Sequence, residues 1–406
     1  MLAKAKLFST CVALLFAFVS ATSEAGEPAK KKLQIYIMAG QSNMVGHANY
    51  ITLPALLTAQ EPGVNQLAKW IFKEGAIAPG AAKDQIETRL QRDKLSSELK
   101  AKKFTDPEKI AAAQAELKKL DAELEFKSKK IKDAFTVSKR VYITSIGDGH
   151  RRSGPLSIGY GGSPDKIGPE LGFGLALEQK LDAPILLIKT AWGGKSLHYD
   201  FRPPSAGPYE LSKDEAKKEN AQKIKENAGL NFRLMNSAVQ EVLKDLKKHH
   251  PEYDASVGHE IAGFVWFQGF NDQFSPAFRD NYKNNMIAFV KDVRQEYQVP
   301  NMPFVIGVLG TGVTKEGVDK NAVSVGQRAA AAAPEFKDTV VAVESYPFFD
   351  LNALAIFQKD WTKHQLEFFQ VGSDRPYHYM GSGKFFVRIG DALATAMVDL
   401  RKKQKP

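Results

Sequence analysis

The chain has 406 residues, of which 43% are apolar and 10% are aromatic. A chain of this composition can bury a sizeable core, which excludes wholesale disorder. The formal net charge is +10, but 16 basic and 11 acidic residues lie together between Lys83 and Arg140, where the pattern indicates a solvent-exposed helical pair. The basic excess is therefore weak evidence for a nucleic acid partner, and we expect none.

The N-terminus has the pattern of an export signal. Lys4 and Lys6 precede an apolar run at residues 7–19, and small residues follow it. We expect a cleaved signal peptide over residues 1–25 and no transmembrane anchor afterwards, because the apolar run is too short to span a membrane stably. Cys11 is the one cysteine and lies inside this segment, so we expect no disulfide or thiol chemistry in the mature protein. Export without disulfides favours a bacterial periplasmic or extracellular location.

Five short apolar runs predict the strands of a buried parallel sheet. Each run is nearly continuous rather than alternating, as in strands that are covered on both faces. The runs are Leu33–Ala39, Pro184–Thr190, Ile261–Phe267, Met302–Leu309 and Thr339–Glu344. Helical patterns lie at Pro169–Lys180, Leu230–Lys248, Tyr282–Tyr297, Ala322–Ala333 and Gly383–Lys402. The alternation predicts a doubly wound, flavodoxin-like α/β domain over residues 26–406, with a five-stranded parallel sheet in a three-layer α/β/α arrangement.

The segment 83–137 does not fit this alternation. It carries two runs of apolar residues at nearly heptad spacing, separated by Asp106 and Pro107, which can cap and start a helix. We therefore expect a coiled-coil-like helical hairpin inserted into the domain. The apolar stripe favours packing of the two helices on each other, and a partner that binds the hairpin is the alternative.

Residues that can build a catalytic site follow three of the predicted strands. In a doubly wound sheet, ligands bind at the carboxyl ends of the strands. The segments found there are Gly40-Gln41-Ser42-Asn43, Trp192-Gly193-Gly194 and Gln268-Gly269-Phe270-Asn271-Asp272. Ser42 lies where free backbone N–H groups can hold an oxyanion, although a serine in this position is also a common helix cap.

The C-terminal region supplies a candidate base and its acid. His378 follows Asp374 by four residues on a predicted loop, an arrangement that suits a general base and the carboxylate that orients it. His47 and His198 lie near strand ends and are the alternative bases. The sequence shows no metal-ligand cluster and no phosphate-binding loop, so we expect no metal and no cofactor.

The joint order of these segments resembles the SGNH hydrolase superfamily, specifically its sialate O-acetylesterase and acetylxylan-esterase-like branch of carbohydrate esterases. The resemblance rests on GQSNM at 40–44, WGGKS at 192–196, WFQGFND at 266–272 and DRPYHY at 374–379, and on Glu170 in a Gly-Pro-Glu segment. It covers most of the chain outside the hairpin. It implies a secreted serine esterase that removes acyl groups, acetyl in the first place, from a carbohydrate substrate.

The resemblance implies a role for each residue. Ser42 is the expected nucleophile, His378 the base and Asp374 its acid. The expected oxyanion donors are the backbone N–H groups of Ser42 and of Gly193 or Gly194, and the side chain of Gln268. The residues expected to contact substrate are Gln41, Asn43, Trp192, Asn271, Asp272 and Tyr377.

Two departures from the family pattern keep other interpretations open. Arg375 occupies the position where the family's aspartate is expected, and Phe270 and Asn271 replace a Glu-Ser pair. The acid is therefore the least secure member of the triad. The alternatives are a lipase- or thioesterase-like hydrolase for another acyl ester, and a catalytically silent carbohydrate-binding or scaffolding protein.

Overall fold

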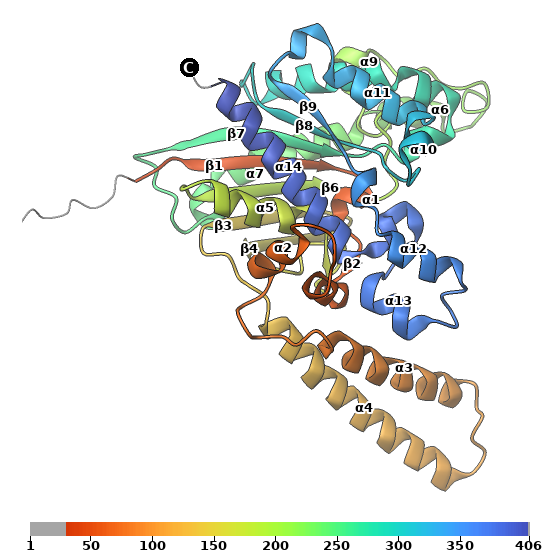
Figure 1. The fold of residues 1–406 in the computed structure, drawn as a ribbon. Helices are drawn as coiled ribbons and strands as arrows, with labels where there is room; N and C mark the ends of the chain where they lie inside the picture. The colour runs from red at the N-terminus through yellow and green to blue at the C-terminus, as the bar shows by residue number, and fades with distance from the viewer. Residues whose placement is uncertain (1–29, 405–406) are drawn as a thin grey trace, which may run out of the picture. The chain divides into compact units, whose positions relative to one another are not determined.

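A central seven-stranded sheet contains all five predicted strands. The computed structural model describes residues 30–404, so the predicted signal peptide and Cys11 lie outside the described residues. The strand order is β4-β3-β6-β1-β7-β8-β9 (Figure 1). The predicted strands are β1 (Leu33–Gly40), β6 (Ile185–Ala191), β7 (His259–Phe267), β8 (Phe304–Val308) and β9 (Val340–Glu344). They pair in parallel in the flavodoxin-like order: second, first, third, fourth and fifth along the chain.

The prediction of a five-stranded, all-parallel sheet was wrong at one edge. β3 (Val141–Gly147) pairs in parallel with β6, and β4 (His150–Pro155) pairs antiparallel with β3. β3 interrupts its apolar residues with Thr144 and Ser145, and β4 has the sequence HRRSGP without an apolar run. β4 is the edge strand, and charged residues and proline are common on edge strands, where they block pairing with a further strand.

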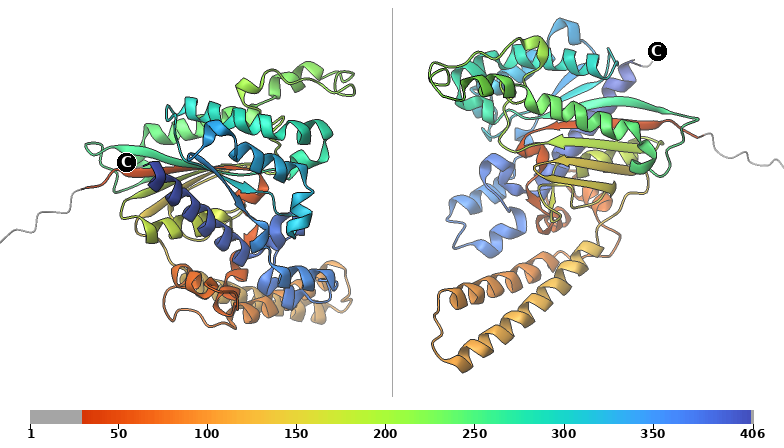
Figure 2. Two further views of the ribbon diagram at one scale, coloured as in Figure 1. Left: turned by 45° about the horizontal axis from the view of Figure 1, so that its top comes forward. Right: turned by 180° about the vertical axis from the view of Figure 1, so that it is seen from behind.

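Helices cover both faces of the sheet (Figure 2). One face packs against α5 (Pro169–Lys180) and α14 (Gly383–Gln404). The other packs against α7 (Leu230–Lys244), α9 (Pro276–Glu296) and α11 (Ala322–Ala331). Side chains along β1 alternate between the two cores, which explains why the central strands are apolar at nearly every position.

Shorter elements connect these layers. The remaining strands and helices are β2 (Ala48–Asn49), β5 (Lys166–Ile167), α1 (Ser42–Val45), α2 (Val64–Ile71), α6 (Ala221–Asn227), α8 (Leu246–His249), α10 (Lys315–Asp319), α12 (Leu351–Gln358) and α13 (Gln365–Val371). The 3-10 turns are η1 (Tyr50–Leu57), η2 (Pro204–Ala206), η3 (Asn271–Phe274), η4 (Pro334–Phe336), η5 (Tyr346–Phe348) and η6 (Pro376–Gly381). Among the described residues, no helix combines the length and the apolar character needed to cross a membrane.

The segment 83–137 contains two long helices that contact each other. α3 (Ala81–Lys100) and α4 (Pro107–Asp133) are joined by a short connection, and the Asp106 side chain caps α4 by accepting from the Glu108 N–H. The tip of the pair lies away from the sheet (Figures 1 and 2). At its base, the chain before α3 is bridged to the chain after α4, because Phe72 and Phe135 form an antiparallel β-bridge.

Candidate active site

Three candidate segments leave the sheet side by side. Gly40, the last residue of β1, is in register with Ala191 of β6 and Phe267 of β7. A Cβ atom on Gly40 would lie 2.1 Å from the carbonyl oxygen of Phe267, so only glycine allows this approach. Because the strand order reverses around β1, this edge is the switch point at which doubly wound sheets bind ligands.

Ser42 begins α1 and faces the loop that carries His378. Its side chain is 8% exposed. α1 contacts η6, and the Asn43 Nδ2 atom donates to the Tyr377 carbonyl at 3.3 Å. Within the described residues, no hydrogen bond joins the side chains of Ser42 and His378. Such bonds are often long or poorly aligned before substrate binds, so the arrangement is compatible with a nucleophile and its base.

The loop that carries His378 is held by a buried tyrosine. The Tyr379 ring stacks on Phe385 with centroids 3.8 Å apart, and its hydroxyl bonds to the Gly310 N–H and to Ser345 Oγ, each at 2.9 Å. Tyr379 and Met380 have φ values of 51° and 63°, in the left-handed region that L residues rarely adopt. Their strained turn is fixed by the burial of Tyr379, which packs in the core and does not reach substrate.

The Asp374 carboxylate lies beside two histidines, His378 and His47. Asp374 Oδ1 lies 3.2 Å from His378 Nδ1, and Asp374 Oδ2 lies 3.6 Å from His47 Nδ1. The two imidazole rings stack at 4.1 Å with an interplanar angle of 4°. His378 Nδ1 is close to the carboxylate but lacks a hydrogen bond of good geometry. The four-residue spacing therefore still brings Asp374 to the histidine, and His47 shares the same acid.

The histidine pair and Asp374 are a poor site for a metal ion. Their donor atoms all lie within 4.8 Å of one another. However, parallel stacked rings direct their in-plane lone pairs along parallel lines rather than toward one point. The Lys166 ammonium also lies 3.9 Å from Asp374 Oδ2 and 3.4 Å from His47 Nδ1, where it opposes a second cation.

Burial and neighbouring charges shift the pKa values of His47 and Asp374. Burial, together with the neighbouring His378 and Lys166, lowers the pKa of His47 to about 4, so His47 is neutral at neutral pH. Burial acts to raise the pKa of Asp374, but the contact with His378 and the Arg375 N–H outweigh it, and the net shift is downward. Asp374 is therefore ionised at neutral pH, as an orienting acid must be.

Gln268 is fully engaged inside the protein, which contradicts its expected role as an oxyanion donor. Its Nε2 atom donates to the Lys195 carbonyl at 3.0 Å and to Asp272 Oδ2 at 2.5 Å. Its Oε1 atom accepts from the Tyr282 hydroxyl at 2.8 Å. Both amide hydrogens are used, and the side chain is buried, so Gln268 holds the loop after β6 against the end of β7.

Asn271 is less buried than Gln268, and one of its amide hydrogens is free to donate a hydrogen bond. Its Nδ2 atom donates to the Gly194 carbonyl at 2.8 Å, and its Oδ1 atom accepts from Gln41 Nε2 at 3.1 Å. The second Nδ2 hydrogen has no partner among the described residues. Sequence reasoning placed Asn271 among the substrate contacts and gave the donor role to Gln268, because the resembled branch has a glutamine in that role.

The glycine pair after β6 presents one free N–H. Gly193 donates its N–H to Asp148 Oδ2 at 2.8 Å. Gly194 has a φ of 68°, and its N–H makes no hydrogen bond among the described residues. Asp148 comes from the turn between β3 and β4, two strands that the sequence did not predict, so this contact could not be expected.

Three of the expected substrate contacts have structural roles instead. Gln41 Oε1 accepts from the N–H groups of Gly269 and Asn271, and the whole side chain is buried. Asn43 is buried and links α1 to the His378 loop. The Asp272 carboxylate is fully buried and accepts from Gln268 and two backbone N–H groups. These side chains position the site and do not face substrate.

Trp192 and Tyr377 remain at the surface of the site. Trp192 is partly buried, and its ring centroid lies 6.0 Å from that of Phe201. Tyr377 is 43% exposed, and its ring lies 4.5 Å from that of His378. Of the two, Tyr377 is the better placed to contact a bound substrate.

A buried ion pair lies behind Ser42. The Lys189 Nζ atom donates to Glu170 Oε2 at 2.7 Å, and to the carbonyl oxygens of Val45 and Tyr160 at 2.8 Å each. Glu170 Oε1 accepts from the Gly168 N–H at 2.8 Å. Burial lowers the pKa of Lys189, whereas Glu170 opposes this shift. The signal in the sequence is a lysine in the otherwise apolar strand PILLIKT.

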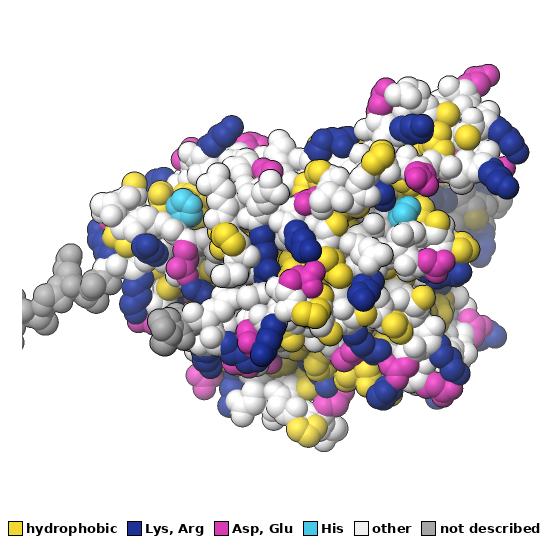
Figure 3. Space-filling model, turned by 90° about the horizontal axis from the view of Figure 1, so that it is seen from above, with side chains coloured by type: hydrophobic (Ala, Val, Ile, Leu, Met, Phe, Trp, Pro, Cys, Tyr) yellow, Lys and Arg dark blue, Asp and Glu magenta, His cyan; other side chains and the backbone are white. Residues whose placement is uncertain are grey.

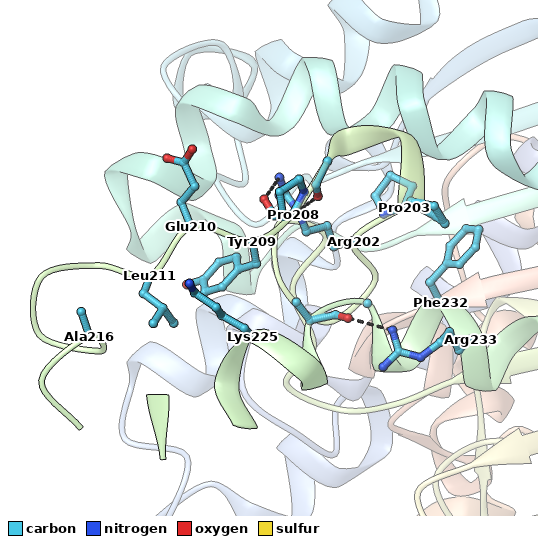
Figure 4. Close-up of a pocket in the computed structure, with 14 residues that line it drawn as sticks. Arg202, Pro203, Pro208, Tyr209, Glu210, Leu211, Ala216, Lys225, Phe232 and Arg233 are labelled. Carbon is cyan, nitrogen blue, oxygen red and sulfur yellow. Dashed lines mark hydrogen bonds between the residues drawn. The ribbon is translucent and has the colours of Figure 1, made fainter. Parts of the chain in front are cut away.

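A separate cavity of about 660 Å³ lies beside the loop that follows β6 (Figure 4). Two of its three basic side chains are hydrogen-bonded within the protein. Arg202 donates to the carbonyl oxygens of His198, Ala206 and Gly207, and Arg233 donates to that of Ala228. These arginines organise the loop, and most of their N–H donors are already used. On the face shown in Figure 3, basic and acidic side chains are interspersed with hydrophobic ones.

Comparison with known proteins agrees with the resemblance seen in the sequence. A family model described as carbohydrate esterase, sialic acid-specific acetylesterase, matches residues 150–346. The matched range includes the WGGKS and WFQGFND segments and excludes Ser42 and His378. Comparison with curated proteins gives no match.

Three solved structures show a partial likeness to this chain. A protein from Arabidopsis thaliana has 14% identity and a TM-score of 0.44, over 90% of this chain and 98% of that chain. A carbohydrate acetylesterase from Xanthomonas citri has 11% identity and a TM-score of 0.43, over 92% of this chain and 57% of that chain. NanS has 11% identity and a TM-score of 0.37, over 78% of each chain. Likeness at this level carries no argument about function.

The family match confirms the resemblance to carbohydrate esterases and defines the class of the protein. It is a carboxylic ester hydrolase. Within that class, the matched family is that of the sialic acid-specific acetylesterases.

The buried Asp272 carboxylate generates a prediction for stability. Burial raises the pKa of the Asp272 carboxyl from its ordinary value near 3.8 to about 6, although its hydrogen bonds oppose this shift. The folded protein therefore binds this proton more tightly than the unfolded chain does. The stabilising contribution is fully present below about pH 4 and is lost as the pH rises through about 6, by about 3 kcal/mol.

We expect the free energy of unfolding of wild type, relative to Asp272→Asn, to fall by about that amount between pH 4 and pH 7. Urea unfolding of both proteins at each pH measures it. The other titrating groups are common to both proteins and cancel in the difference. A difference that does not change with pH would contradict the raised pKa of Asp272.

Proposed function

We propose that the protein is an exported serine esterase that removes acetyl groups from a carbohydrate by a Ser-His-Asp mechanism. The observation that carries this proposal is that Ser42 and the Gly193-Gly194 pair follow adjacent strands at the switch point of the sheet, where α1 contacts the turn η6 that carries His378, the partner of Asp374. The matched carbohydrate esterase family supports the class of substrate. The location rests on the signal peptide that the sequence predicts at residues 1–25.

The mechanism is acyl transfer in two displacements. The Nδ1 side of His378 faces Asp374, which leaves Nε2 as the base. Nε2 takes the proton of the Ser42 hydroxyl while Oγ attacks the ester carbonyl carbon. The tetrahedral intermediate collapses as His378 returns the proton to the departing sugar oxygen. Water, activated by the same histidine, then releases acetate from Ser42.

The oxyanion donors follow from the hydrogen bonds of the site. The N–H of Ser42 lies in the first turn of α1, where a helix leaves N–H groups without intrahelical partners. The N–H of Gly194 and the second Nδ2 hydrogen of Asn271 complete a set of three. This assignment replaces Gln268, whose hydrogens are donated inside the protein, by Asn271.

Acetate release tests the proposal directly. We expect wild type to release acetate from acetylated polysaccharides or O-acetylated sialic acid, and Ser42→Ala to fall to near the background rate, because the nucleophile is lost. Release is measured with purified proteins of equal thermal stability. If Ser42→Ala hydrolyses these substrates as fast as wild type, Ser42 is not the nucleophile.

The two stacked histidines can be distinguished by matched substitutions. We expect His378→Asn to lower kcat on p-nitrophenyl acetate by at least about 10². We expect His47→Asn to lower it by less than tenfold, because His47 is neutral and lies farther from the acid. Steady-state kinetics at pH 7.5 gives both values. The reverse ranking would make His47 the base and His378 its neighbour.

The third oxyanion donor can be identified in the same way. We expect Asn271→Ala to lower kcat by about 10²–10³, the usual effect of removing one oxyanion donor. Gln268→Ala is expected to lower thermal stability, since it removes one buried hydrogen-bond partner from Asp272 and one from Tyr282. Kinetics and thermal unfolding are measured for both variants. Retention of wild-type kcat by Asn271→Ala would exclude this residue as a donor.

A further inference from the structure

Residues 374–381, the acid–base loop, are closed at their neck by hydrogen bonds. The N–H groups of Ser373 and Asp374 both donate to the Met380 carbonyl, at 2.7 Å and 3.0 Å. The Ser373 hydroxyl donates to the Gly381 carbonyl at 2.8 Å. A Cβ atom on Gly381, whose φ is 56°, would lie 2.6 Å from Ser373 Oγ, so this closure needs a glycine. The two ends of the loop are therefore fastened to each other.

Two hydroxyl groups attach the ends of the acid–base loop to one residue, Asn49. Ser373 Oγ accepts from the Asn49 N–H at 2.9 Å. Thr52 Oγ1 donates to the Asn49 carbonyl at 2.8 Å and accepts from the Gly383 N–H at 2.9 Å. Ser373 precedes the loop and Gly383 follows it. The buried Tyr379 thus anchors the middle of the loop to the core, and the two hydroxyl groups anchor its ends to the end of β2.

Asn49 belongs to the short segment that carries the candidate nucleophile. This segment runs from Ser42 at the start of α1 to Asn49 at the end of β2. It also contains His47, whose ring stacks on His378 and whose carbonyl oxygen lies 3.4 Å from Ser373 Oγ. In the part of the chain that the structure describes, the side chains of Ser42 and His378 share no hydrogen bond. Their spacing therefore depends on how the loop is attached to this segment, and a displacement of about 1 Å can cost about 10²-fold in rate.

We propose that Ser373 and Thr52 are positioning residues, whose hydroxyl groups hold the acid–base loop in register with Ser42. The inference rests on the proposed function and adds to it two residues that act through others. Thr52 is fully buried, and the hydrogen bonds of both hydroxyl groups go to backbone groups. Removal of one hydroxyl frees one end of the loop, while the other end and Tyr379 stay attached. We therefore expect loss of alignment without loss of the fold.

The test compares variants that differ in the hydroxyl group. Thr52→Val removes it and keeps the shape of the side chain, whereas Thr52→Ser keeps it. Ser373→Ala is matched with Ser157→Ala, because Ser157 is also partly buried and donates to a backbone carbonyl, that of Thr136, at 2.7 Å. We expect Thr52→Val and Ser373→Ala each to lower kcat on p-nitrophenyl acetate about tenfold, with KM changed less than about twofold. Thr52→Ser and Ser157→Ala should stay within about twofold of wild type.

Hydrogen exchange keeps the positioning role separate from the esterase assignment. Mass spectrometry of peptides that cover residues 373–383 reports opening of the loop without any substrate. We expect Ser373→Ala and Thr52→Val to raise the exchange of these amides, and Ser157→Ala to leave it unchanged. If exchange rises in this way but wild type cleaves no ester, the attachment of the loop stands and the esterase proposal fails. Wild-type kcat in both variants that lack the hydroxyl, or loop exchange equal to that of wild type, overturns the positioning role.

Discussion

A buried charge pair holds together the segments on which the site is built. Lys189 on β6 donates to Glu170 on α5, and the same ammonium donates to the carbonyl oxygens of Val45, at the end of α1, and of Tyr160, before β5. Transfer of two charges from water into the core is costly, and only a complete set of partners offsets it. Loss of one member would leave an unpaired charge, at a cost of about 3–5 kcal/mol. The turn after β1, and with it Ser42, is thus anchored from beneath by an interaction that contacts no substrate.

The central strands and their helices could be predicted because the burial of each element leaves a local pattern of apolar residues in the sequence. Strands covered on both faces need apolar side chains at nearly every position, and the five runs from Leu33–Ala39 to Thr339–Glu344 all became strands. β3 and β4 could not be found in this way. Their pairing is specified by neighbours and by the Asp148 turn, where φ is 41°, rather than by an apolar pattern of their own.

The site was only partly predictable for a related reason. Ser42 and the Asp374–His378 pair are recognisable because their order along the chain and their place after strands are visible in one dimension. The choice between Gln268 and Asn271 is different, since it depends on which amide hydrogens are already used. Those hydrogens are used by Lys195, Asp272 and Gly194, and such partners appear only when the chain is folded. The stacking of His47 on His378 likewise becomes visible only when the chain is folded.

The bridge between Phe72 and Phe135 has a consequence for how the chain tolerates change. The chain leaves the domain and returns to it at one point, where the Lys73 N–H bonds to the Ala134 carbonyl and the Thr136 N–H to the Ile71 carbonyl, each at 2.9 Å. The segment between those residues is closed into one loop at its base, and the entropic cost of closing a loop grows only with the logarithm of its length. Nearer the base, α3 also packs on α13, and Gln85 bonds to the Tyr50 hydroxyl. Lengthening or shortening the tips of α3 and α4 in step, beyond these contacts, would therefore leave the geometry around Ser42 nearly unchanged, so the tip is free to diverge independently of catalysis.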